Sequence, residues 1–504
     1  MLKKSATQSF PELFFSTKAT SASVSHAVKH GELRRIGPRL YTTRLDLDAA
    51  EVIRKHWRTV VAGYFPAGVI GFRTALDGKP AATGDVFVSA HTRKVVSLDG
   101  LRISAVKGPG ALDGDMPLPR GIFWASRARA LLESARPSRS VSGAARGMRP
   151  EELEAWLERF LQIEGADRLN RLRDDMRRLA LTPSDDSAPL PVAKDAFQRL
   201  DSIVGTLLGT RQVAMSALVA KARVAQMPFD AARVDLIAAL HERLAGMLLP
   251  APPDPAPTGS AARHLAFLDA YFSNYIEGTE FDVGEAREVV FTGKVIPGRA
   301  DDTHDIVGTF ELVSDRQFMH GGPATWTDPE VFLAALQAAN RQIMRGRPAK
   351  RPGELKTVAN RAGATVFVDP TLVRGTLREG YALVRALEHP FARAAALMFL
   401  ISEVHPFDDG NGRVARAFMN AELVAAGHCR ILIPTVFRED YIGGLRALSR
   451  HGHAAPLLDA LQYAQKVTSQ IAYEDLDDAI HTLAACHAFD DNDDARLRLP
   501  LAKT

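Results

Sequence analysis

The sequence of 504 residues has little cysteine and no long apolar run. Its two cysteines, Cys429 and Cys486, cannot build a framework of disulfides, which favours a reducing cytoplasm as the compartment. The most apolar stretch, at 394–401, is too short to cross a bilayer, and the N-terminus has no apolar run long enough for a signal peptide. We therefore expect a cytoplasmic protein with no membrane partner.

Composition and charge indicate several globular domains with different partners. Hydrophobic residues make up 46% of the chain and charged residues 24%, and a chain of this length is expected to form roughly two to four domains. Residues 1–150 hold 24 Lys and Arg against 11 Asp and Glu, a net charge of +13, while the remaining residues carry −9. A basic first third suggests a nucleic-acid partner at that end.

The residue types that suit nucleotide chemistry are concentrated at 405–416, His-Pro-Phe-Asp-Asp-Gly-Asn-Gly-Arg-Val-Ala-Arg. The segments 390–404 and 413–426 are both predicted to be helices, so the loop leads into a helix N-terminus. Free N–H groups and the helix dipole attract anions at such a terminus. Gly410 and Gly412 let the backbone approach a phosphate closely.

Five side chains of this motif fit the same chemistry. His405 titrates near neutral pH and can accept a proton. Asp409 is an oxygen donor suited to Mg²⁺. Arg413 and Arg416 are three residues apart on one helix and suit phosphate oxygens, and Phe407 is expected to fix the loop against the core. Together these parts predict a nucleotidyl transfer site.

The order and spacing match the signature of the Fic family, His-x-Phe-x-(Asp/Glu)-Gly-Asn-Gly-Arg-x-x-Arg, at every fixed position. The resemblance covers about 195–480 and implies a protein adenylyltransferase, which moves AMP from ATP and Mg²⁺ onto a hydroxyl of a target protein. The resemblance assigns His405 as the base, Asp409 as the Mg²⁺ ligand, Gly410, Asn411 and Gly412 to the α- and β-phosphates, Arg413 to the γ-phosphate, and Arg416 to the β/γ end.

A second segment, Ser273-Asn-Tyr-Ile-Glu-Gly278, resembles the inhibitory motif of the Fic family, (Ser/Thr)-x-x-x-Glu-(Gly/Asn). Apolar residues at helical spacing predict a helix over 260–278 with Ser273 and Glu277 on one face. The resemblance implies that Glu277 pairs with Arg413 and thereby blocks productive ATP. Glu277 could instead orient a water that removes AMP, and the sequence leaves both roles open.

Two segments between these motifs have weaker patterns. Residues 353–370 predict a β-hairpin, with strand-like residues at 365–368 and turn residues at 360–363. In Fic proteins a hairpin flap here aligns the target by strand addition, and an ordinary connecting hairpin is the alternative. The acidic stretch 301–305, which includes His304, is interpreted as a solvated loop rather than a metal cluster.

Residues 1–50 predict a winged helix-turn-helix, with a short helix at 20–30 followed by a basic hairpin. The residues expected to face DNA are Ser23, Ser25, His26, Lys29, Arg34, Arg35 and Arg39. The segments 31–41 and 66–76 resemble antitoxins of the AbiEi type, which bind operator DNA and repress their own genes. The resemblance implies an operator DNA partner, and a role in protein contact is the alternative.

The expected fold is mainly α. A helical Fic domain with a small β-hairpin flap at 195–480 follows an α+β N-terminal region, made of the winged helix at 1–50 and a basic AbiEi-like part at 51–182. A solvated acidic tail is expected at 481–504. The proline-rich stretches 182–191 and 249–260 are linkers, unless the second is a loop inside the Fic region.

The alternatives to an autoinhibited transferase use the same motifs. One is a hydrolase that removes AMP at the same site. Another is a DNA-binding regulator whose Fic domain only senses nucleotide. A third is a Fic enzyme with a different donor, because the motif grips phosphates rather than the base. A homodimer is expected, since many Fic proteins and winged-helix regulators dimerise.

Overall fold

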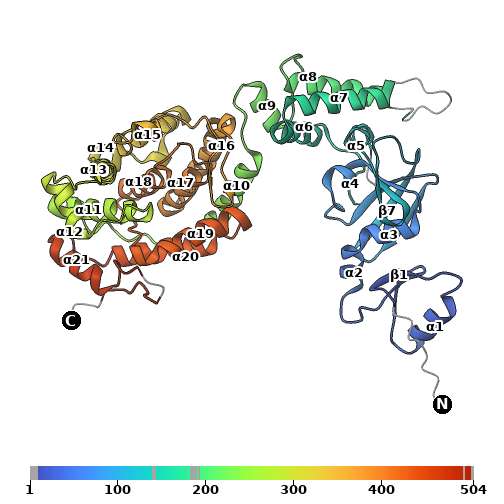
Figure 1. Ribbon diagram of the computed structural model, residues 1–504, viewed down its shortest axis with the longest axis horizontal. Coiled ribbons are helices and arrows are strands. Elements are labelled where there is room, and N and C mark those ends of the chain that lie inside the picture. The colour runs from blue at the N-terminus through green and yellow to red at the C-terminus, as the bar shows by residue number, and fades with distance from the viewer. Residues whose placement is uncertain (1–9, 139–142, 182–189, 191–192, 492–493, 501–504) are drawn as a thin grey trace. The chain divides into compact units, whose positions relative to one another are not determined.

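The computed structural model describes residues 10–138, 143–181, 190, 193–491 and 494–500. Its internal contacts divide the chain into two compact units, residues 1–224 and residues 225–504 (Figure 1). The boundary follows α9 (Leu218–Val224), whereas the Fic-like region was predicted to start at residue 195. All but one residue of the proline-rich stretch 182–191 lies outside the described residues.

Unit 1 begins with a short helix and a three-stranded antiparallel sheet of order β1-β3-β2. Their bounds are β1 Leu13–Phe15, α1 Ser21–Lys29, β2 Arg34–Gly37 and β3 Leu40–Thr42. Val24 and Ala27 bury the apolar face of α1 against Phe14 and Leu33. The predicted helix and hairpin are confirmed. Residues 10–20 form β1 and a turn, so the described chain has no second helix in front of α1 to complete a helix-turn-helix.

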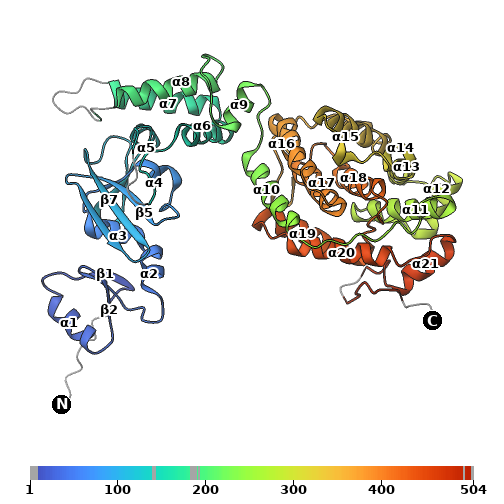
Figure 2. The same ribbon diagram turned by 180° about the vertical axis from the view of Figure 1, so that it is seen from behind.

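A six-stranded mixed sheet follows, with the order β6-β7-β5-β4-β9-β8. The strands are β4 Val69–Ile70, β5 Asp85–Ala90, β6 Lys94–Leu98, β7 Leu101–Lys107, β8 Met116–Leu118 and β9 Ile122–Trp124. Figure 2 shows β5 beside β7, and the two strands pair in parallel. The strands predicted between 85 and 105 are therefore confirmed. Val86, Val88 and Ile103 face a core shared with Trp57 and Val60.

The helices of unit 1 cover this sheet and build a second core. They are α2 Ala49–Lys55, α3 Trp57–Tyr64, α4 Phe72–Asp77, α5 Arg127–Ser134, α6 Pro150–Glu164, α7 Ala166–Leu181 and α8 Lys194–Leu207. Leu172 and Met176 of α7 share a buried cluster with Leu200 of α8. Residues 194–207 therefore belong to unit 1, because the apolar face of α8 is buried against α7.

Unit 2 is helical apart from one small hairpin. Its helices are α10 Ala231–Ala245, α11 Gly259–Ile276, α12 Val283–Thr292, α13 Ala300–Ser314, α14 Arg316–Met319, α15 Pro329–Ile343, α16 Val373–Arg385, α17 Pro390–Val404, α18 Asn411–Ala425, α19 Arg438–His451, α20 Ala455–Thr468 and α21 Leu476–Ala485. Almost every side chain of α17 is buried, which suits a helix that is apolar on all sides. Figure 1 shows α17 and α18 in the middle of the unit, with other helices around them.

Two connecting segments of unit 2 are packed rather than free. The Pro252 carbonyl accepts a hydrogen bond from Cys429 N at 2.9 Å, so the proline-rich stretch 249–260 is a loop inside unit 2 rather than a linker between domains. The described part of 481–500 is not a solvated tail: Cys486 and Leu497 are buried, and Phe489 stacks on Phe272 of α11 at 5.2 Å. A few apolar residues among the acidic ones explain this difference. No helix of the described chain is both long and apolar enough to span a membrane.

Candidate active site

The predicted loop between two helices is present, and it joins α17 to α18. His405 ends α17 with a φ of 53°, a left-handed conformation that a non-glycine residue rarely adopts. Asn411 starts α18 and pins the loop, because its Oδ1 accepts from Phe407 N and its Nδ2 donates to Phe407 O, both at 2.9 Å. Phe407 is 1% exposed, as expected for an apolar anchor. The loop is thus held from both sides.

The predicted inhibitory segment lies on this loop. Glu277 follows the last residue of α11 and its Oε1 accepts from Arg416 Nη2 at 2.7 Å. Ser273 Oγ accepts from Arg416 Nε at 3.0 Å, so Ser273 and Glu277 share a face as predicted. Gly278, with a φ of 90°, turns the chain away immediately afterwards.

The expected partner of Glu277 was wrong: the sequence analysis paired it with Arg413, and the structure pairs it with Arg416. Residues three apart on a helix point about 60° away from each other, so the two arginines reach different neighbours. Arg416 faces α11, whereas Arg413 faces α13.

The carboxylate of Glu277 lies directly on the first turn of α18. A Cβ built on Gly412 would overlap Glu277 Oε1, so only glycine leaves room for the carboxylate there. Burial favours a raised pKa for Glu277, but Arg416 and Arg413 outweigh it and lower the pKa. The side chain is therefore an anion at neutral pH, and it occupies the position where a helix N-terminus attracts anions.

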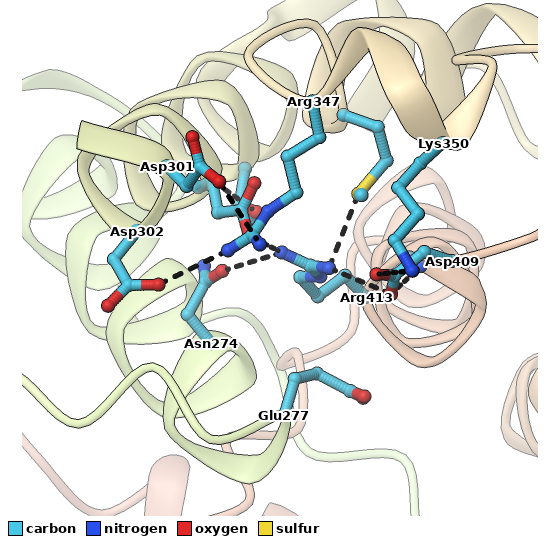
Figure 3. A network of polar contacts seen from close by, with 12 residues as sticks. Asn274, Glu277, Asp301, Asp302, Arg347, Lys350, Asp409 and Arg413 are labelled. Atoms are coloured by element: carbon cyan, nitrogen blue, oxygen red, sulfur yellow. Dashed lines mark hydrogen bonds and ion pairs between the residues drawn. The ribbon is translucent and has the colours of Figure 1, made fainter. Parts of the chain in front are cut away.

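Arg413 is surrounded by acidic groups on a different side of the loop. Its Nη1 lies 2.6 Å from Asp305 Oδ2, and its Nη2 lies 3.4 Å from Asp409 Oδ1. Figure 3 shows Arg413 between Asp409 and the group formed by Arg347, Asp301 and Asp302. The interpretation of 301–305 as a solvated loop was wrong. These residues form the first turn and a half of α13, and Asp305 is 1% exposed because it faces two arginines inside the unit.

An aromatic ring covers His405. Phe367 stacks on the imidazole with a centroid distance of 3.8 Å and an angle of 6°. Phe367 directly follows the hairpin of β10 (Arg361–Ala362) and β11 (Thr365–Val366), which is shorter than the predicted one. Residues 361–362, expected in the turn, belong to a strand, and the turn is at 363–364. Burial lowers the pKa of His405 to about 4, so the imidazole is neutral at physiological pH.

Two arginines from other helices hold the hairpin. Arg233 Nη2 donates to Val366 O at 2.8 Å, and Arg450 Nη2 donates to Thr365 Oγ1 at 2.9 Å. Arg233 also forms an ion pair with buried Glu403. Burial raises the pKa of Glu403 in spite of this partner. The hairpin is therefore tied to α10 and α19 while Phe367 covers His405.

Asp409 is the predicted magnesium ligand, and its carboxylate is partly exposed. Its side chain is 35% exposed, and Lys350 Nζ lies 3.8 Å from Asp409 Oδ2. Asn340 Nδ2 donates to the Asp409 carbonyl at 2.9 Å and fixes the backbone. The described residues hold no group of three or more His, Cys, Asp or Glu that could bind a metal alone. A single carboxylate can still contribute to Mg²⁺ binding, because Mg²⁺ often takes its other ligands from phosphates and water.

A cavity of about 270 Å³ opens beside His405, Glu277 and Gly412. Its walls also include Thr365 of the hairpin, Phe367 directly after the hairpin, and Ser402, Tyr441, Ile442, Leu445 and Ser449. The lining thus combines His405 and Arg416 with the apolar side chains of Ile442 and Leu445 from α19. Such a combination suits a ligand with an anionic end and a flat apolar end.

The sequence analysis missed three residues of this site. Asp305 was assigned to solvent, and Asn340 and Lys356 were not singled out. Lys356 is 2% exposed and donates to Asn360 Oδ1 at 2.8 Å and to Val404 O at 3.2 Å, beneath the loop. Burial lowers its pKa to about 8. Its sequence context is that of a surface residue, so no local pattern could have identified it.

The N-terminal residues predicted to face DNA are mostly exposed. The exposed residues among them are Ser23, Ser25, His26, Lys29, Arg35 and Arg39. Arg34 is half-buried and donates to the carbonyls of Arg44 and Leu47, so it braces its own chain instead of facing outward.

Residues 330–423, from α15 to α18, match the model of the Fic/DOC family. This segment resembles a Fic domain. The matched residues include the whole loop from His405 to Gly410 together with Arg413 and Arg416.

Curated proteins that are similar to part of this chain are named protein adenylyltransferases. Fic-1 of Caenorhabditis elegans is 26% identical over 191 residues, which cover 36% of this chain and 36% of that protein. Fic of Nematostella vectensis is 26% identical over 212 residues, which cover 40% of this chain and 48% of that protein. A solved structure of C. elegans Fic-1 has a TM-score of 0.37 and 16% identity, covering 64% of this chain and 87% of that one. The matches span between a third and a half of the curated relatives' length.

Proposed function

We propose that this protein is an adenylyltransferase that transfers AMP from ATP to a hydroxyl group of a target protein, and that Glu277 keeps it inactive. One observation carries the proposal: Glu277 puts a carboxylate on the first turn of α18 and bonds to Arg416, beside His405. An anion held there by an arginine stands in for the phosphate that the loop would bind.

The transfer follows from the side chains around the loop. With Glu277 displaced, the N–H groups of Gly410 to Gly412 and the guanidinium of Arg416 bind the phosphates of ATP. His405, neutral because of its lowered pKa, accepts the proton of the incoming hydroxyl. The hydroxyl oxygen bonds to the α-phosphorus, the bond to the β-phosphate oxygen breaks, and pyrophosphate leaves. Mg²⁺ held by Asp409 would supply positive charge to the phosphates.

The position of the label in ATP tests the reaction. Glu277→Gly incubated with a candidate target and with ATP labelled at the α-phosphate should give covalently labelled protein. ATP labelled at the γ-phosphate should give none, because that phosphate leaves with pyrophosphate. Covalent label from the γ-phosphate alone would contradict the proposal and indicate phosphate transfer. Nucleotide binding with no covalent label from either position would indicate a nucleotide-sensing regulator.

Removal of AMP is the second candidate reaction. It is favoured by the 32% exposure of the Glu277 side chain, which lines the same cavity as His405 and can reach a water there. Wild-type protein should then release AMP from a modified target, and Glu277→Ala should lose this activity. Release that is unchanged in Glu277→Ala would exclude this role of Glu277.

We further propose that unit 1 binds DNA, as the resemblance of its segments to AbiEi antitoxins implies. The exposed side chains of α1 and of the β2–β3 hairpin support this, together with the net charge of +13 over residues 1–150. Affinity for the DNA upstream of the protein's own gene should fall in Lys29→Ala and in Arg35→Ala, and in each variant the affinity should depend less on salt concentration. The affinity should not change in His405→Ala. Equal binding by all these variants would contradict the assignment.

Both cysteines are free and buried, which supports a reducing compartment.

A further inference from the structure

A buried lysine lies beneath the loop between α17 and α18. Lys356 is 2% exposed, and its ammonium forms no ion pair with any residue that the structure describes. Burying an ammonium without a carboxylate partner is unfavourable, and this burial lowers the pKa of Lys356 to about 8. Ionisable groups with such perturbed pKa values are concentrated at functional sites. The hydrogen bonds of Lys356 indicate what it does there.

These hydrogen bonds end on both sides of His405. The ammonium Nζ donates to Val404 O at 3.2 Å, and the backbone N of Lys356 donates to Pro406 O at 2.9 Å. His405, between these two residues, has the left-handed φ of 53°. A residue other than glycine keeps such a conformation only where its surroundings fix it. Lys356 therefore holds the carbonyl groups immediately before and after the strained residue.

Asn360 extends the same network to the hairpin and to the ring above the imidazole. Its Oδ1 accepts from Lys356 Nζ at 2.8 Å, and its Nδ2 donates to Phe407 O at 3.0 Å. Its carbonyl accepts from Phe367 N at 3.2 Å. Because Phe367 stacks on His405, one asparagine connects the lysine, the loop and the aromatic cover of the imidazole.

The position of the His405 backbone determines where its free ring nitrogen lies. Nδ1 is 3.3 Å from Ser402 O, and a carbonyl oxygen can only accept a hydrogen bond. The proton of the neutral ring is therefore on Nδ1, which leaves Nε2 to act as the base. A displacement of about 1 Å in a reacting group can slow a reaction by about a hundredfold, so the backbone of His405 has to be held closely.

We propose that Lys356, together with Asn360, is a positioning residue that holds the backbone of His405 where its imidazole meets the incoming hydroxyl. The inference rests on the proposed function, in which His405 accepts the proton of that hydroxyl. The phosphates, by contrast, are bound by the N–H groups at the start of α18 and by Arg416. Loss of the ammonium therefore slows the transfer step and leaves nucleotide binding nearly unchanged.

The experiment measures transfer and nucleotide binding separately in Glu277→Gly and in the same protein carrying Lys356→Met or Lys356→Arg. Transfer is the rate of self-modification at saturating ATP and Mg²⁺. Binding is measured calorimetrically with an ATP analogue that has a methylene group between the α- and β-phosphorus and so cannot react. Methionine has a similar length and no donor, so the rate should fall at least about tenfold while the affinity stays within about threefold. Arginine keeps a charged donor and should recover most of the rate.

Lys294→Met is the matched control. Lys294 is an exposed lysine of the same unit that pairs with Glu288, far from the loop in sequence. Its rate and its affinity should both stay within about threefold of the parent values. A loss of rate as large as that of Lys356→Met would show that removal of any lysine has this effect, and it would overturn the inference.

Each remaining outcome also decides the inference. A rate within about threefold of the parent in Lys356→Met would overturn it. An affinity that falls as far as the rate would overturn it as well, since the loop as a whole would then be damaged, and so would a Lys356→Arg variant as slow as Lys356→Met.

A second variant covers the case in which Lys356→Met does not melt cooperatively. Asn360→Ala removes the bonds to the Lys356 ammonium and to Phe407 O at a half-buried position, and it should also lower the rate while leaving the affinity nearly unchanged. Transfer at the parent rate in Asn360→Ala would overturn the inference. Absence of label in Glu277→Gly itself would instead overturn the proposed function, and this inference with it.

Discussion

At the scale of single residues, His405 combines an unusual backbone conformation with an unusually low pKa. Its left-handed φ of 53° ends α17 and directs the side chain toward the cavity shared with Glu277 and Gly412. Burial under Phe367 lowers its pKa to about 4, with Lys356 acting in the same direction. A base that is already unprotonated can accept a proton at any pH near neutrality.

The low pKa of His405 predicts that the kcat for AMP transfer by Glu277→Gly changes little with pH. A lowered pKa means that the proton-free imidazole persists as the pH falls, until the pH approaches about 4. Glu277 raises the pKa of His405, so its removal should lower that pKa further. The rate constant kcat should therefore stay constant from about pH 8 to about pH 5.5. A loss of kcat with a midpoint near the ordinary histidine pKa would contradict this reading.

Residue types and spacing predicted much of the site, but not its partners. The motif identified His405 and Asp409, and the inhibitory pattern placed Glu277 near the arginines. The pairing of Glu277 with Arg416 could not be predicted, because it depends on how α11 packs on α18. Asp305 was missed because it lies about a hundred residues before Arg413 in the sequence and only tertiary burial distinguishes it from a surface acid.

At the scale of elements, the hairpin β10–β11 is held closed by groups outside it. Arg233 donates a hydrogen bond to the Val366 carbonyl, which would otherwise be free to accept from an added strand. Arg450 donates a hydrogen bond to the Thr365 hydroxyl. Phe367 then remains on His405. A target that docks by strand addition has to displace these contacts.

Arg233→Ala should loosen this hairpin. The Phe367 amide, which donates to Asn360 O at 3.2 Å, should exchange its hydrogen about tenfold faster, because the hairpin loses its tie to α10. Arg374→Ala is the matched control, since Arg374 is an exposed arginine of α16 that pairs with Glu330. Equal exchange of the Phe367 amide in the two variants would show that Arg233 does not restrain the hairpin.

Whole elements differ in how well the sequence predicted them. The helix expected at 390–404 is α17 with the same bounds, and the inhibitory helix expected at 260–278 is α11, because continuous apolar periodicity and glycine ends are local signals. The hairpin and the C-terminal residues were less predictable. A strand of two residues has almost no pattern, and the burial of Cys486 and Leu497 depends on a few apolar side chains within an acidic stretch.

At the scale of the whole molecule, unit 1 contains the net positive residues 1–150, and unit 2 contains the segment that matches the Fic/DOC family. The sequence predicted the charge difference between the two regions, and the structure divides the chain at residue 224. The central claim belongs to unit 2: a competent transfer site is kept inactive by one carboxylate of its own chain. This claim predicts that removing that carboxylate alone creates activity.

The most direct measurement is self-modification with ATP labelled at the α-phosphate, in the presence of Mg²⁺. Wild type is compared with Glu277→Gly, with Glu277→Gly combined with His405→Ala, and with Glu280→Gly. Glu280 is an exposed glutamate three residues after Glu277 and serves as the matched control. We predict strong label only in Glu277→Gly. Equal label in wild type and Glu277→Gly would contradict inhibition by Glu277, and label that survives the loss of His405 would contradict the assigned base.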